Sequence, residues 1–94
     1  MKYRTLSFTR DKELQEFFLQ HIRGRLSEIE IPTELKPEIL AEVFWALKKE
    51  PIAVAISDED YNILSKASSE LGVSRRLLAV YITIQEMKFY SEAM

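Results

Sequence analysis

The chain begins with alternating polar and apolar residues, and this pattern predicts a half-buried strand over residues 2–9. Leu6 and Phe8 fall on one face of the strand, where we expect them to pack against a core. The opposite face carries hydroxyl groups, on Tyr3, Thr5 and Ser7. We therefore expect the hydroxyl face of the strand to be exposed.

Two helices are predicted in the rest of the first half. Apolar residues recur at helical spacing over residues 14–22, and Gly24 marks the end of this helix. A polar connector over residues 25–36 follows, and Pro37 suits the first turn of the next helix. That helix stops before Pro51. Its apolar stripe consists of Ile39, Leu40, Val43, Phe44 and Leu47.

The second half repeats this order with clearer boundary signals. A short apolar run at 52–56 predicts a strand, and Ser57 is expected to cap the helix that follows, with Asp60 in capping-box position. Gly72 supplies the left-handed stop that a tight turn requires. Ser74 then caps the final helix.

The final segment carries two conflicting signals. Residues 80–84 are β-branched and aromatic enough to form a strand. No turn signal separates them from residues 75–79 or 85–89, however, and a continuous pattern of this length favours a helix. Because this helix is apolar on nearly all sides, we expect it to be the most buried element.

The predicted order is therefore strand, helix, helix, then the same again, in two units at residues 1–50 and 51–94. The segments that match in pattern are 7–9 with 55–57, and 40–43 with 78–81. A chain of 94 residues has room for one core only, so the two units are expected to form a single domain.

The second unit combines an apolar strand, the capping Ser57, a turn at Leu71–Ser74 and a basic helix start at Arg75–Leu78. This combination resembles the ribbon-helix-helix family of Arc/MetJ/CopG type. The resemblance implies a mostly α fold with a short two-stranded antiparallel ribbon, in the order β-α-α-β-α-α. Members of the family are dimers, so it implies a homodimer or, through the repeat, a pseudo-dimer within one chain.

In that family the ribbon enters the major groove of double-stranded DNA, and the start of the second helix contacts phosphate. The resemblance thus implies a small DNA-binding transcriptional regulator. The residues expected at nucleic acid are Lys2, Tyr3, Thr5, Ser7, Ser74, Arg75 and Arg76. The second strand would present only Ala53 and Ala55, whose methyl groups offer no hydrogen bond.

Two alternatives remain open from the sequence. Residues 68–78 also fit a helix-turn-helix, in which Ser74, Arg75 and Arg76 open the recognition helix. The second alternative is a protein-binding module, antitoxin-like or inhibitor-like, on a degenerate ribbon-helix-helix scaffold. Its expected partner contacts are aromatic side chains, on Trp45, Phe89 and Tyr90.

Composition excludes several other classes. With 13 basic and 15 acidic residues the net charge is −2, so any attraction to phosphate must come from local clusters. The chain has no cysteine, which excludes disulfides and thiolate chemistry. His21 is the sole histidine and has no catalytic partner nearby in sequence. We therefore expect a protein that is not an enzyme and binds no cofactor or metal. We also expect that it has no membrane segment and is located in the cytoplasm.

Overall fold

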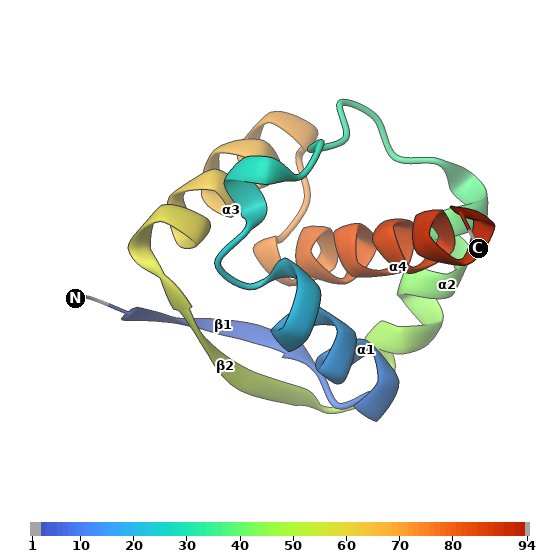
Figure 1. Cartoon of the computed structure of the whole chain (residues 1–94), viewed down its shortest axis with the longest axis horizontal. Coiled ribbons are helices and arrows are strands. Elements are labelled where there is room, and N and C mark those ends of the chain that lie inside the picture. The colour runs from blue at the N-terminus through green and yellow to red at the C-terminus, as the bar shows by residue number, and fades with distance from the viewer. Residues whose placement is uncertain (1–2, 94) are drawn as a thin grey trace.

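The computed structural model describes residues 3–93, and it describes the side chains of residues 3–91. The fold is mostly helical with one two-stranded sheet (Figure 1). The elements in chain order are β1 (Tyr3–Thr9), α1 (Lys12–Phe17), a π-helical turn η1 (Phe18–Ile22), a 3₁₀ turn η2 (Leu26–Glu28), α2 (Pro37–Leu47), β2 (Pro51–Ser57), α3 (Asp58–Leu71) and α4 (Arg75–Ala93).

The two strands come from the two halves of the chain and pair antiparallel, which confirms the predicted two-stranded ribbon. The register places Tyr3 opposite Ser57 and Thr9 opposite Pro51. Leu6 therefore lies opposite Val54 at the centre of the ladder. The ribbon runs along one side of the molecule, and the helices all lie on the same face of the ribbon (Figure 1).

The core lies between the ribbon and α4. Leu6, Phe8 and Ile56 are buried, as the alternating pattern predicted for the first strand, and Phe8 stacks on Phe18 with ring centroids 4.8 Å apart. The segment Leu78–Ile84 is helical and buried throughout. The predictions that this segment is a helix and that it is deeply buried are thus confirmed.

Ser57 caps α3 as predicted, because its hydroxyl accepts a hydrogen bond from the Asp60 N–H. The Asp60 carboxylate does not complete the predicted capping box, since it accepts a hydrogen bond from the Gly24 N–H instead. Asp11 also acts as a cap, and its side chain accepts a hydrogen bond from the Leu14 N–H at the start of α1. Gly24 and Gly72 both have positive φ, and Gly72 ends α3 in the left-handed conformation.

The connector between η1 and α2 contributes more to the core than its polar sequence indicated. Leu26 is buried, and Ile29, Ile31 and Leu35 pack against the core. The Lys36 N–H donates to the hydroxyl of Tyr81 at 2.8 Å. The connector therefore covers one side of α4.

The apolar stripe predicted on α2 was wrong at Phe44. Ile39, Val43 and Ala46 are the buried residues of this helix, whereas 54% of Phe44 is exposed. Positions 39, 43 and 46 follow the spacing i, i+4 and i+7 that faces a core. Phe44 lies one residue beyond that face and points toward solvent.

None of the helices in the described part of the chain is both long and apolar enough to cross a bilayer.

Candidate nucleic-acid interface

The outer face of the ribbon is formed by small and hydroxyl-bearing side chains. Tyr3, Thr5 and Ser7 are all exposed, as predicted, and so are Ala53 and Ala55. In the antiparallel register Thr5 lies opposite Ala55 and Ser7 lies opposite Ala53. Since directly opposed residues share a face of the sheet, the outer face has a column of hydroxyl groups beside a column of methyl groups.

Two arginines contact one tyrosine ring at the end of the ribbon where Tyr3 pairs with Ser57. The guanidinium of Arg4 lies 4.6 Å from the ring centroid of Tyr61, and that of Arg75 lies 4.7 Å from it. These are cation–π distances. Asp58 also accepts a hydrogen bond from the Arg4 Nε at 3.2 Å. The first turns of α3 and α4 and the start of β1 therefore meet in a cationic cluster of Arg4, Tyr61 and Arg75.

Arg76 occupies a different position from its neighbour Arg75. Its Nε donates to the Phe8 carbonyl, and its Nη2 donates to the Lys49 carbonyl, each at 3.0 Å. These bonds tie the first turn of α4 to the end of β1 and to the segment just before β2. The guanidinium that we expected at phosphate thus also has a structural role, which the sequence did not indicate.

Ser74 is the cap of α4. Its hydroxyl accepts a hydrogen bond from the Leu77 N–H at 3.0 Å, which confirms the predicted capping role. The Val73 N–H donates back to the Ser68 carbonyl at 3.0 Å and closes the turn around Gly72. The side chains of Ser74 and Arg75 are both exposed.

The corresponding helix start in the first unit is built differently. Pro37 is the first residue of α2, as predicted, and Lys36 provides no side-chain cap. The Lys36 N–H is taken by Tyr81, and Glu34 and Glu38 flank the turn. Carboxylates repel phosphate, so the start of α2 is less suited to bind an anion than the start of α4.

Arg23 is a further basic residue at the ribbon, and sequence reasoning missed it. Its Nη1 donates to the Ala55 carbonyl of β2 at 3.4 Å, and the next residue, Gly24, donates its N–H to Asp60 at 2.6 Å. Tyr3, Arg23 and Ser57 line a cavity of about 490 Å³ at this end of the ribbon. No local signal in the sequence joins residue 23 to the second strand, because the contact depends on how η1 folds back. Lys2, the remaining predicted residue, lies outside the described residues.

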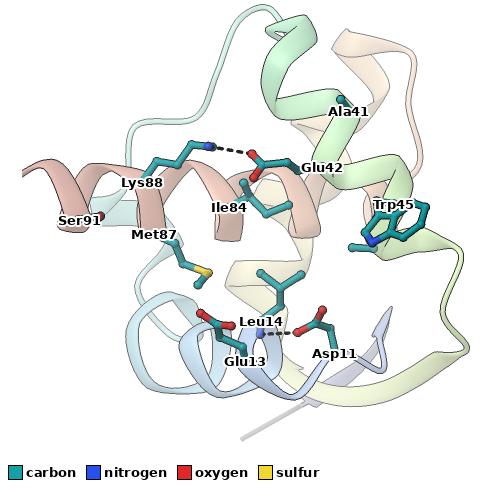
Figure 2. A pocket seen from close by; sticks show the side chains of 11 residues that line it. Asp11, Glu13, Leu14, Ala41, Glu42, Trp45, Ile84, Met87, Lys88 and Ser91 are labelled. Atoms are coloured by element: carbon teal, nitrogen blue, oxygen red, sulfur yellow. Dashed lines mark hydrogen bonds and ion pairs between the residues drawn. The ribbon is translucent and has the colours of Figure 1, made fainter.

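The aromatic residues predicted at a protein partner do not form one surface. Trp45 is 69% exposed on α2, where it lines a groove between α1, α2 and α4 (Figure 2). Phe89 is 64% exposed and lines a separate groove beside the connector. Tyr90 packs edge-on against Phe17, with ring centroids 5.6 Å apart. The structure therefore separates Trp45 from Phe89 and Tyr90.

Charges near the ribbon are largely balanced. Arg10 lies 3.9 Å from Glu50, and Lys49 lies 2.8 Å from Asp11. The hydrogen bond from Lys49 holds the pKa of Asp11 below its usual value, against the opposing effect of partial burial. Arg75, by contrast, has the ring of Tyr61 as its neighbour and no ion pair with a described acid.

No group of histidine, cysteine and acidic side chains suited to a metal ion is found within residues 3–91. Comparison of the chain with protein-family models, with curated proteins and with solved structures found no match.

Proposed function

We propose that this protein is a small DNA-binding transcriptional regulator of ribbon-helix-helix type, in which one chain supplies both strands of the ribbon. The observation that carries the proposal is the exposed hydroxyl face of an antiparallel ribbon built from the two halves of the chain. The ribbon would enter the major groove, and the start of α4 would contact phosphate.

The register of the ribbon supports an internal two-fold relation between the units. The sequence repeat aligns Leu6 with Val54, and these residues also lie opposite each other. Exchanging the units turns the pair Tyr3–Ser57 into the pair Pro51–Thr9, which is the other end of the same ladder. The last helices of the units, α2 and α4, also pack against each other. A pseudo-dimer within one chain has these properties.

The dimensions of the ribbon are compatible with the groove. Adjacent strands lie about 4.8 Å apart, and the major groove of B-DNA is about 12 Å wide. The hydroxyls of Thr5 and Ser7 can donate to or accept from base edges, whereas the methyl groups of Ala53 and Ala55 can contact only thymine methyl groups. We therefore expect an asymmetric DNA site. β1 would read one half of it by hydrogen bonds, and β2 would read the other half by shape.

Phosphate binding would be local, since the net charge is −2. Arg75 is exposed at the start of α4, where main-chain N–H groups and the helix dipole both favour an anion. Arg4 shares the ring of Tyr61 with Arg75, but it is paired with Asp58 at 3.2 Å, so Arg75 is the residue expected to contact phosphate. The helix-turn-helix alternative also uses Arg75, but paired strands have no role in it. The presence of the ribbon therefore favours the ribbon-helix-helix proposal.

The test of groove reading is binding of the full chain to a randomised duplex library, followed by fluorescence anisotropy on the selected sequence. The double variant Thr5→Ala/Ser7→Ala should lose about thirtyfold in affinity for that sequence, because two base-edge contacts of about 1 kcal/mol each sum to about 2 kcal/mol. The matched control is Ser27→Ala/Thr33→Ala, which removes the same hydroxyls from the connector, where both residues are exposed. The absence of any binding at low salt would reject the proposal.

The test of phosphate contact is the salt dependence of the same affinity. Arg75→Ala should weaken binding to all duplexes alike and reduce the slope of log K against log salt by about 1. Lys66→Ala is the matched control, because it removes an exposed charge from the outside of α3. If both variants weaken binding equally, Arg75 makes no direct phosphate contact and acts only through the overall electrostatic field of the protein.

The second candidate function is the protein-binding module on the same scaffold. The alanines on the outer face of β2 favour it, because they leave half of the ribbon without hydrogen-bonding side chains. If Thr5→Ala/Ser7→Ala keeps full affinity for duplex DNA, the ribbon does not read base edges, and the protein-binding module is favoured.

A further inference from the structure

The outer edge of β2 carries a guanidinium group, that of Arg23, whose Nη1 donates to the Ala55 carbonyl at 3.4 Å. Hydrogen-bonded and non-hydrogen-bonded pairs alternate along an antiparallel ladder. The Arg10 N–H donates to the Glu50 carbonyl at 2.8 Å, just beyond the end of the ladder. The pair Thr5–Ala55 lies an odd number of steps from this bonded pair, in the same register, so it is a non-hydrogen-bonded pair. The Ala55 carbonyl therefore points away from β1, and Arg23 lies at the edge of β2 that faces away from β1.

The start of α4 lies beside the other strand. Arg75 shares the ring of Tyr61 with Arg4, which belongs to β1. The first turn of α4 is also bonded to the carbonyl of Phe8 in β1, and the body of α4 packs on β1. The exposed guanidinium groups of Arg75 and Arg23 therefore flank the ribbon, one on the side of each strand.

The charge of Arg23 is not neutralised by an ion pair with any described acid. The acid that lines the same cavity, Asp60, is buried and accepts the Gly24 N–H at 2.6 Å. In contrast, the Nε of the nearby Arg25 lies 4.0 Å from Glu28. A guanidinium has several N–H donors, and a single main-chain carbonyl occupies only one of those of Arg23. The others can donate to an anionic oxygen.

The cavity of about 490 Å³ beside Arg23 adjoins the outer face of the ribbon. Tyr3, Ala55 and Ser57 line it, and these residues share the outer face, because opposed residues and alternate residues of a strand lie on the same side of a sheet. Arg23 is thus the basic side chain nearest to the alanine side of the surface that we expect to face the bases.

We propose that Arg23 binds a DNA phosphate on the side of the major groove opposite to the phosphate that Arg75 contacts. The proposal rests on the proposed DNA binding by the ribbon. When the outer face of a ribbon lies against the base edges, its two edges face the two sugar–phosphate backbones, which belong to different DNA strands. Phosphate contacts fix the register of a protein on the duplex without reading sequence. An arginine at each edge would centre the ribbon in the groove.

The test uses the selected duplex with single phosphates replaced by uncharged methylphosphonates, one position at a time on each strand. Fluorescence anisotropy of the full chain measures the affinity, which for the wild type should fall about tenfold at positions on both strands. Arg23→Ala should lose about tenfold on the unmodified duplex and lower the slope of log K against log salt by about 1. It should also become insensitive to methylphosphonates on one strand, and Arg75→Ala on the other.

The matched control is Arg25→Ala, which removes the same exposed side chain two residues further along and should keep the methylphosphonate pattern of the wild type. Arg23→Lys retains the charge and should recover most of the salt slope, and circular dichroism establishes that each variant is folded. If the wild type binds but Arg23→Ala keeps its pattern, or if Arg23 and Arg75 act on the same strand, the proposal is overturned. A loss by Arg23→Ala that depends on one base pair would assign a base contact and would also overturn it. The absence of wild-type binding would instead reject the proposed function itself.

Discussion

Replacing Arg76 by alanine removes the two hydrogen bonds by which the first turn of α4 holds the ribbon. The Nε bond to the Phe8 carbonyl is partly buried, and the Nη2 bond to the Lys49 carbonyl is exposed. The variant leaves both carbonyls without this donor, at the end of β1 and just before β2. We therefore expect a larger loss of stability than Arg75→Ala produces.

The size of the effect follows from the burial of each bond. Hydrogen bonds that involve a charged group contribute about 1.5–3 kcal/mol when they are shielded from water. The exposed bond to Lys49 competes with water and contributes less. We expect Arg76→Ala to lower the free energy of unfolding by about 2 kcal/mol, a large share of the roughly 5–15 kcal/mol that is typical of a domain.

The assay is urea unfolding of the full chain followed by far-UV circular dichroism. Arg75→Ala is the matched control, since its guanidinium makes an exposed cation–π contact that contributes about 0.5–1 kcal/mol. Arg76→Lys should fall between wild type and Arg76→Ala, because a single ammonium cannot reproduce the planar fork that reaches both carbonyls. An Arg76→Ala variant within about 0.5 kcal/mol of wild type, or no more destabilised than Arg75→Ala, would refute this reasoning.

Three other local contacts make separate predictions for stability. Asp60→Ala removes the buried carboxylate that accepts the Gly24 N–H at 2.6 Å, and we expect urea unfolding to show a loss of about 2 kcal/mol. Gly72→Ala forces a side chain into the left-handed region at φ 71°, and the expected cost of about 1 kcal/mol is pure backbone strain because no atom lies within 4 Å of the new Cβ. Since Lys49 lowers the pKa of Asp11, that carboxylate stabilises the fold above its unfolded pKa of about 3.9, and the contribution is lost as the pH falls through the lower folded pKa. The difference in unfolding free energy between wild type and Asp11→Asn should therefore be present at neutral pH and disappear in strong acid; a difference that is constant with pH would contradict this assignment.

Local signals in the sequence predicted the order of elements and most of their boundaries. The cap at Ser57, the turn at Gly72 and the alternation of Leu6 and Phe8 each depend on neighbours within a few residues. The choice of helix over strand for residues 80–84 was also correct, because the absence of a turn signal outweighed β propensity. These features are set by short-range chemistry, which the sequence displays directly.

The contacts that sequence reasoning missed all join distant segments. Arg76 binds the carbonyls of Phe8 and Lys49, Arg23 binds the carbonyl of Ala55, and no pattern of residue types reports a main-chain partner so far away. The burial of Asp60 likewise depends on Gly24, which reaches it only after η1 folds back. The π-helical turn η1 shares the apolar spacing of an α-helix and was not distinguishable from one.

The most direct test of the central claim is an NMR titration of the isotope-labelled full chain with the selected duplex, with the molecular mass in solution measured alongside. The account predicts that a monomer binds and that amide shifts concentrate on the ribbon at Thr5, Ser7 and Ala55 and on the start of α4 at Arg75. Shifts confined to the groove around Trp45, or a homodimer that pairs two copies of the same strand, would contradict it.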